Sequence, residues 1–113
     1  IALAVPDLSV PYFAELAGYM MRAAQGHDLT LLIEETDGDR EREVLFLTGS
    51  RSSTIDGLIL SPLTAEAEDL TGPSRSVPVV LLGERTYDEP LDHIAIDNVR
   101  AAREATAHLL HLG

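Results

Sequence analysis

The sequence predicts an α/β fold, in which a doubly wound parallel sheet carries helices on both faces. Two observations predict it. Along all 113 residues, short apolar segments alternate with segments whose apolar residues recur every three or four positions. Hydrophobic residues make up 45% of the chain and aromatic residues only 4%, which is typical of a globular domain rich in Ala, Leu and Val. A chain of this length can bury a core as one compact domain.

Five apolar segments are predicted as strands, and four helical segments follow or separate them. The strands are predicted at residues 1–5, 29–33, 58–60, 77–82 and 93–96. The helices are predicted at residues 11–25, 40–53, 65–70 and 99–112. Such βαβ units are expected to cross over with a right-handed turn. The residues alone leave the strand order open, and 2-1-3-4-5 is the order that we expect.

Apolar stripes support the two longer helices near the amino terminus. The first helix begins at Pro11, which suits a first helical turn, and ends before Gly26. Its stripe comprises Phe13, Leu16, Ala17, Met20, Met21 and Ala24. The second helix has a looser stripe, which comprises Val44, Leu45, Leu47 and Thr48.

The charge balance argues against nucleic acid as a direct partner. The chain has 8 basic and 19 acidic residues and a net charge of −11, and all its basic residues are Arg. Because DNA affinity comes largely from cations that neutralise phosphates, an acidic surface should be repelled by DNA. No apolar run approaches the ~18 residues that a membrane-spanning helix requires, and the chain opens in a strand rather than a signal peptide. We therefore expect no membrane association.

In the order 2-1-3-4-5, ligands are expected beyond the carboxyl ends of the strands, near the point where the order reverses between strands 1 and 3. The loops at that edge offer hydroxyls, carboxylates, one cation and aromatic rings, the groups that sugar-like or nucleoside-like ligands need. The candidates at this stage are Asp7, Ser9, Tyr12, Phe13, Ser61, Glu84, Arg85 and Asp97.

Several of these candidates have an equally simple structural role. Asp7 and Ser9 can cap the first helix, and Asp97 can cap the last one. Phe13 also lies on the apolar stripe, so it can pack in the core. Arg85 can form a surface ion pair with Asp88 or Glu89.

Motifs for catalysis and metal binding are not found. The chain has no GxGxxG after the first strand, no GxxxxGK[ST], no GxSxG and no HExxH. It also has no Cys. His108 and His111 lie three apart on the last helix, where two solvated histidines are the simpler interpretation. We expect no catalytic residue, no metal site and no cofactor.

Five strings occur in one order and at matching spacing, and they resemble one family. They are IALAVPDLSVPYFAEL (1–16), TDGDREREVLFL (36–47), IDGLILSP (55–62), VPVVLLGER (77–85) and HIAIDNVRAAREATAHLLHLG (93–113). Together they are similar to the effector-binding domain of the lactose/galactose-repressor (LacI/GalR) family of bacterial transcriptional regulators. That domain is itself similar to periplasmic sugar-binding proteins, and the resemblance covers essentially the whole chain.

The resemblance implies that residues 1–113 are the amino-terminal subdomain of a two-lobed effector-binding domain. In this family a small, sugar-like molecule binds between the lobes. A homodimer binds operator DNA through a helix-turn-helix domain. Both the helix-turn-helix and the carboxy-terminal subdomain lie outside this chain. Such regulators are cytoplasmic and are not enzymes. Carried over to this sequence, the effector contacts are Asp7, Ser9, Tyr12, Phe13, Ser61, Leu63 and Asp97, with Arg85 added from the loop after the fourth strand. Sugar-binding relatives commonly have Asp-Arg in that loop, whereas this chain has Gly83-Glu84-Arg85.

Two other functions remain open from the residues. A periplasmic sugar-binding protein of a transporter shares the fold and carries a secretion signal. An α/β enzyme of flavodoxin-like topology also shares the alternating pattern. We further expect the chain on its own to bind sugars very weakly, because the site is shared between two lobes. We also expect it to self-associate or to be partly disordered, since it lacks the strand that should follow the last helix.

Overall fold

A computed structural model describes residues 1–48 and 54–113, and it contains one five-stranded parallel sheet. The strands lie in the order β2-β1-β3-β4-β5. Their bounds are β1 Ala2–Val5, β2 Leu32–Glu35, β3 Leu58–Leu60, β4 Val79–Leu82 and β5 Asp92–Ile94. The helices are α1 Pro11–Gln25, α2 Arg40–Thr48, α3 Ala67–Thr71 and α4 Asn98–Leu112. The predicted fold class and strand order are confirmed.

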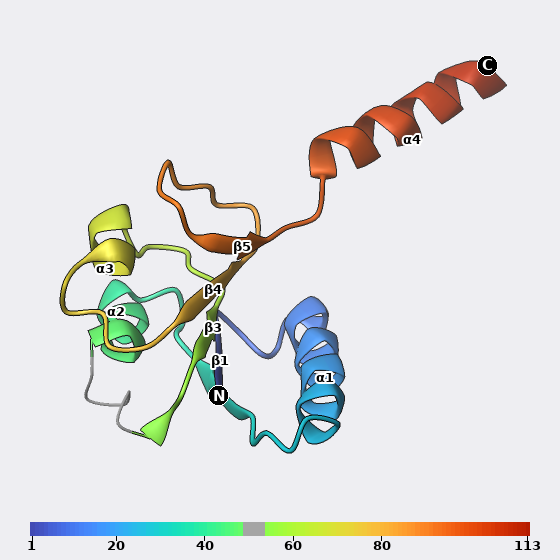
Figure 1. Cartoon of the computed structure of the whole chain (residues 1–113). Helices are drawn as coiled ribbons and strands as arrows, with labels where there is room; N and C mark the ends of the chain where they lie inside the picture. The colour runs from blue at the N-terminus through green and yellow to red at the C-terminus, as the bar shows by residue number, and fades with distance from the viewer. Residues whose placement is uncertain (49–53) are drawn as a thin grey trace.

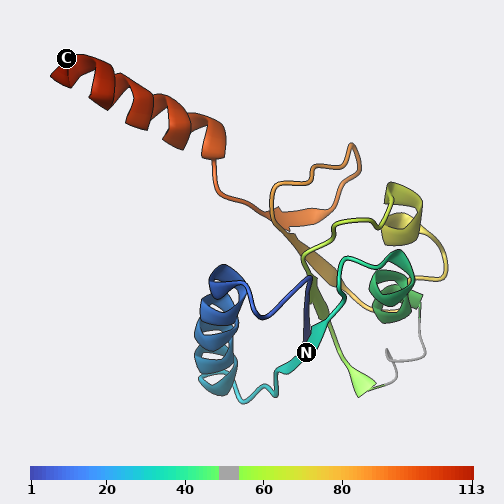
Figure 2. The same cartoon turned by 180° about the vertical axis from the view of Figure 1, so that it is seen from behind.

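The sheet separates two hydrophobic cores, because successive side chains of a strand point to opposite faces. Helix α1 covers one face, and α2 and α3 cover the other (Figures 1 and 2). Leu3 and Val5 of β1 pack on the α1 side, whereas Leu60 of β3 and Leu81 of β4 pack on the side of α2 and α3. All four residues of β1 are buried, so this interior strand is apolar on both faces, as is typical of parallel sheets.

Helix α1 follows the predicted stripe with one exception. Pro11 occupies its first turn, and Ala17 and Ala24 are buried against the sheet. Met21, which the stripe includes, is 43% exposed. Gly26 follows the helix and its N–H donates to the Arg22 carbonyl, but its φ of −66° is right-handed, so the position does not require a glycine.

Several predicted boundaries shift, and the pairing between strands explains the largest shift. The second strand was predicted at 29–33, but residues 32–35 pair with β1, from Ala2 with Leu32 to Val5 with Glu35. Because β2 is an edge strand with half-exposed side chains, it accommodates the two carboxylates at its end. Strand β4 begins after Pro78, which cannot donate to a neighbouring strand. The fifth strand was predicted at 93–96 and is observed at Asp92–Ile94. The third helix was predicted at 65–70 and is observed at Ala67–Thr71.

Helix α2 buries a different set of side chains from the one predicted. Phe46 and Leu47 are buried together with Glu43, whereas Leu45 is 45% exposed. The stripe prediction therefore missed Phe46 and Glu43. The predicted continuation of this helix over 49–53 lies outside the described residues.

Helix α4 has no buried residue, and it extends away from the sheet (Figures 1 and 2). Asp97 caps it by accepting a hydrogen bond of 2.9 Å from the Arg100 N–H. The prediction of helices on both faces therefore holds for α1, α2 and α3, whereas α4 covers neither face. The chain measures 57 × 32 × 24 Å as a result.

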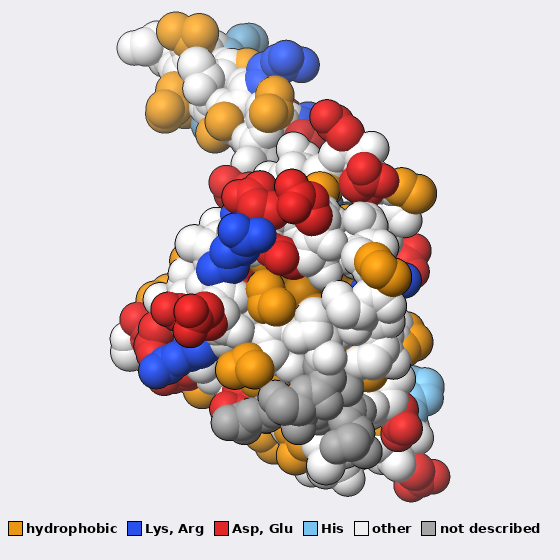
Figure 3. All heavy atoms as spheres, turned by 90° about the vertical axis from the view of Figure 1, so that its left-hand side faces the viewer, with side chains coloured by type: hydrophobic (Ala, Val, Ile, Leu, Met, Phe, Trp, Pro, Cys, Tyr) orange, Lys and Arg blue, Asp and Glu red, His pale blue; other side chains and the backbone are white. Residues whose placement is uncertain are grey.

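The surface over α2 and α3 groups acidic side chains with arginines, and apolar side chains are exposed along α4 (Figure 3). Arg40 of α2 pairs with Asp69 of α3 at 2.9 Å. Across the described residues, every helix is too short or too polar to cross a lipid bilayer.

Candidate functional site

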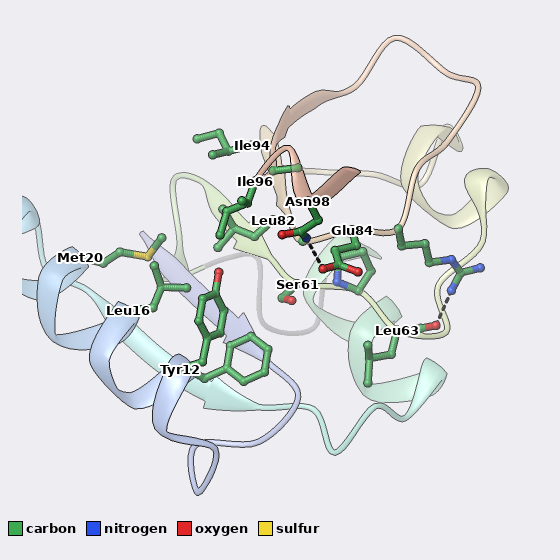
Figure 4. Close-up of a pocket in the computed structure, with 15 residues that line it drawn as sticks. Tyr12, Leu16, Met20, Ser61, Leu63, Leu82, Glu84, Ile94, Ile96 and Asn98 are labelled. Atoms are coloured by element: carbon green, nitrogen blue, oxygen red, sulfur yellow. Dashed lines mark hydrogen bonds between the residues drawn. The ribbon is translucent and has the colours of Figure 1, made fainter. Parts of the chain in front are cut away.

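A cavity of about 760 Å³ lies between α1 and the carboxyl ends of β3, β4 and β5 (Figure 4). Helix α1, which follows β1, supplies one wall. The segments that follow β3, β4 and β5 supply the others. Parallel strands bring their carboxyl ends to one edge, which is why residues so distant in sequence meet here. The lining residues are Tyr12, Phe13, Leu16, Met20, Ser61, Pro62, Leu63, Leu82, Gly83, Glu84, Arg85, Ile94, Ala95, Ile96 and Asn98.

Five of the eight predicted contact residues line this cavity. Tyr12 and Phe13 stand on its α1 wall with their rings edge to face, 5.1 Å between centroids. Ser61 lies at the floor and is 5% exposed. Leu63 lies at the rim (Figure 4), and Arg85 also lines the cavity. The cavity thus combines apolar rings with a few convergent polar groups, as binding sites for small molecules do.

The other three predicted residues, Asp7, Ser9 and Asp97, lie outside the lining. The hydroxyl and the N–H of Ser9 both donate to the Asp7 carboxylate and lower the pKa of that carboxyl, and the N–H contact measures 2.7 Å. Asp97 accepts from the first turn of α4 instead. The side chain at the amino terminus of α4 that reaches the cavity is Asn98. Neither Asp7 nor Ser9 forms a side-chain cap on α1.

Arg85 is held by protein groups beside the cavity. Its Nη1 donates to the Leu63 carbonyl at 2.5 Å, and its Nη2 pairs with Glu66 at 3.0 Å. Its guanidinium also lies 5.3 Å from the centre of the Tyr87 ring. Glu66 is thus its ion-pair partner, in place of the suggested Asp88 or Glu89. The guanidinium thus links the loop after β4 to Leu63 and Glu66 beside the cavity.

Glu84 and Asn98 form a polar pair at the mouth of the cavity that the sequence-based list did not combine. The Asn98 amide donates to the Glu84 carboxylate (Figure 4). This contact ties the first turn of α4 to the loop after β4. Both groups keep further hydrogen-bonding capacity. The sequence signal for Asn98 was the Asp-Asn pair at 97–98. Because the Asp97 side chain caps α4, the Asn98 side chain is the one that faces the cavity.

Gly83 allows the chain to turn at the floor of the cavity. Its φ is +104°, a conformation that other residues adopt only with strain. A Cβ at this position would lie 3.6 Å from the Ser61 hydroxyl. The Gly83 carbonyl contacts the His93 Nε2 at 2.6 Å, so the turn is fixed on its other side.

The apolar wall was also missed by sequence reasoning. Leu82, Ile94 and Ile96 belong to or flank strands, and strand residues of this type are normally core residues. Here Ile94 and Ile96 are each 64% exposed because α4 does not cover them. Among the described residues, no three His, Cys, Asp or Glu side chains are close enough together to hold a metal ion.

The whole chain, residues 1–113, matches the family model described as periplasmic binding proteins and sugar binding domain of LacI family. The chain belongs to this family. Among curated proteins, it is 30% identical to the HTH-type transcriptional regulator DegA of Bacillus subtilis, over 100% of this chain and 35% of that protein. The chain therefore spans about a third of the length of this relative.

Solved structures of the LacI family share the fold. A structure described as a transcriptional regulator of LacI family from Sanguibacter keddieii is 43% identical, with a TM-score of 0.82 over 99% of this chain and 39% of that chain. A periplasmic binding protein/LacI transcriptional regulator from Alkaliphilus metalliredigens, in complex with D-xylulofuranose, is 30% identical. Its TM-score is 0.79 over 99% of this chain and 41% of that chain.

Proposed function

We propose that residues 1–113 form the amino-terminal subdomain of the effector-sensing domain of a LacI-family transcriptional regulator. The effector is a small, sugar-like molecule that binds between this subdomain and a carboxy-terminal one. The observation that carries the proposal is the convergence of α1 and three strand-end segments on one cavity. The regulator names of the relatives favour this function over a transport protein.

The proposed contacts follow from the chemistry of the lining. Tyr12 and Phe13 offer ring faces to the apolar side of a sugar, and Ser61 offers a hydroxyl. Leu63 and Arg85 add to the lining. Asp7, Ser9 and Asp97 remain proposed contacts from outside the lining. The proposal needs no cofactor, no metal and no catalytic group.

The proposed mechanism is a population shift. An effector that contacts both subdomains binds one relative orientation of them more tightly, so that orientation gains population. In a homodimer, this orientation sets the spacing of two helix-turn-helix heads on operator DNA. We assign DNA binding to those heads because the net charge of −11 disfavours it here. A regulator of this type acts in the cytoplasm and needs no membrane partner.

The test is calorimetric titration of the protein at its full natural length with D-xylulose, D-ribose, D-glucose and sucrose. We expect one of these sugars to bind and Tyr12→Ala to weaken its binding about tenfold, because the ring face is lost. Tyr19→Ala is the matched control, since Tyr19 is an exposed residue of α1 outside the cavity lining.

Three results would count against the proposal. Failure of all four sugars to bind contradicts the sugar class of the effector. Equal affinity of the Tyr12→Ala and Tyr19→Ala variants contradicts the location of the site. Tight sugar binding by residues 1–113 alone contradicts a site shared between two subdomains, for which we expect weak binding.

A further inference from the structure

Glu43 is a buried carboxylate on α2 that lies outside the cavity. Its exposure is 0%. Burial of a carboxylate is costly unless hydrogen bonds compensate for the lost water. Here Oε1 accepts from the Leu63 N–H at 2.7 Å, and Oε2 accepts from the N–H groups of Thr64 at 3.1 Å and Ala65 at 2.6 Å. Three successive backbone donors thus converge on one side chain.

The segment that Glu43 holds, residues 63–65, continues the cavity wall formed by residues 61–63. Leu63 is 55% exposed, and its own side chain does little to fix the backbone. The backbone is fixed from two sides. On one side, the Glu43 carboxylate accepts hydrogen bonds from the three amides. On the other side, Arg85 donates to the Leu63 carbonyl, and the Tyr87 hydroxyl donates to the Ala65 carbonyl at 2.9 Å.

The hydrogen bonds that fix the segment differ in number and in burial between the Glu43 side and the side of Arg85 and Tyr87. Arg85 makes one exposed bond to a carbonyl of the segment, and Tyr87, which packs partly buried against the core, makes one more. Glu43 is fully buried and accepts hydrogen bonds from all three amides, and the bond from the Ala65 N–H is itself buried, so loss of the carboxylate leaves a buried donor without its acceptor. The carboxylate is therefore the contact whose loss releases the segment.

We propose that Glu43 is a positioning residue for the effector: it fixes the backbone of residues 63–65 and so sets the shape of the cavity wall. This inference rests on the proposed function, since it assigns the wall a role in binding. It adds a residue on the opposite face of the sheet from α1, in a helix that does not line the cavity. Side-chain anchors of this kind hold binding groups within a narrow range of positions.

The variant that tests it is Glu43→Gln, which keeps the size of the side chain. Its amide nitrogen is a donor and faces donors, so at least one backbone N–H loses its acceptor. The control is Glu41→Gln, the same change at an exposed position of α2. Both are made in the protein at its full natural length.

The first measurement is amide hydrogen exchange, which needs no ligand. We expect the Leu63, Thr64 and Ala65 amides to exchange at least about tenfold faster in Glu43→Gln than in Glu41→Gln, with unchanged exchange in β1 and β3. Equal exchange of the three amides in both variants overturns the proposal. Faster exchange throughout β1 and β3 also overturns it, because the role of Glu43 is then general stability.

The second measurement is the affinity for the four sugars D-xylulose, D-ribose, D-glucose and sucrose. We expect Glu43→Gln to bind about tenfold more weakly than Glu41→Gln, at a temperature where circular dichroism shows both variants folded. Unchanged affinity together with faster loop exchange overturns the positioning role. Where the wild type binds none of the sugars, the proposed function fails, and the exchange result still decides whether Glu43 holds the segment.

Glu43→Asp keeps the test decisive where Glu43→Gln does not fold. The shorter side chain keeps its charge but cannot reach all three donors at the observed distances. We expect this variant to show intermediate exchange and intermediate affinity. Wild-type values for both quantities would overturn the proposal.

Discussion

Leu60 and Leu110 carry the same side chain in opposite surroundings. Leu60 of β3 is 0% exposed, and Leu110 of α4 is 77% exposed. We expect Leu60→Ala to lower the free energy of unfolding by about 2–5 kcal/mol, because it leaves a cavity in the core. At a protein concentration low enough for the chain to be monomeric, Leu110→Ala should change it by less than about 0.5 kcal/mol. Urea denaturation measures both values. A loss at Leu110 as large as that at Leu60 would show that α4 packs against protein in solution.

Sequence analysis finds the site residues that the rule for parallel sheets locates at the carboxyl ends of strands. It misses the residues whose role depends on the groups that surround them in the fold. Tyr12 and Ser61 follow from the convergence of strand ends at one edge. The role of Asn98 depends on Asp97 turning to cap the helix. Glu43 is less predictable still, because the amides that it accepts from lie twenty or more positions away. No local spacing signals such a contact.

Helix α3 has only five residues, and Asp69 links it to α2. The Arg40 guanidinium donates to Asp69 and lowers the pKa of that carboxyl in the folded chain. This contribution to stability is complete above the unfolded pKa of about 3.9 and is lost as the pH falls through the lower folded value.

We expect Asp69→Asn to lower the free energy of unfolding at pH 7 by about 0.5–1 kcal/mol, since Arg40 is half exposed and screened by solvent. The difference from wild type should shrink as the pH falls below about 4, because the carboxyl gains a proton first in the unfolded chain and, at lower pH, in the folded chain as well. Thermal unfolding across this pH range measures it. The control is Glu68→Gln, on the exposed side of α3. A difference that stays constant from pH 7 to pH 3 would contradict the ion-pair account.

At the scale of elements, type and order are predictable and boundaries are less so. The apolar run at 29–33 favours a strand by composition, but hydrogen bonding to β1 selects Leu32–Glu35. A segment only four residues long takes its limits from its neighbour and not from its own pattern. Similarly, Leu45 fits the period of α2 but faces solvent, because α3 and the sheet contact the neighbouring face.

The molecule as a whole exposes more surface than its mass predicts. Its accessible area is 7466 Å², against about 6,100 Å² for a compact monomer of 12.2 kDa. Its radius of gyration is 16.2 Å, against about 13 Å for a compact domain of this length. Much of the excess belongs to α4 and to the apolar residues near it, such as Ile94 and Ile96. Apolar surface of this kind favours association.

We therefore expect residues 1–113 on their own to self-associate. Sedimentation equilibrium should show an average mass that rises with concentration. Leu109→Glu should reduce the association, because it places a charge among the apolar residues of α4. Ala107→Glu is the matched control, since Ala107 lies on the side of α4 that carries Arg100, Glu104 and His111. A strictly monomeric mass at high concentration would contradict this expectation.

The position of α4 also gives the protein a lever arm. A helix of 15 residues is about 22 Å long. It meets the rest of the molecule at Ala95–Asp97 and through the contact between Asn98 and Glu84. A turn of about 15° at that pivot would carry Leu112 through about 6 Å, by the length of the helix alone. A small rotation at the mouth of the cavity would therefore produce a larger displacement at the far end of α4.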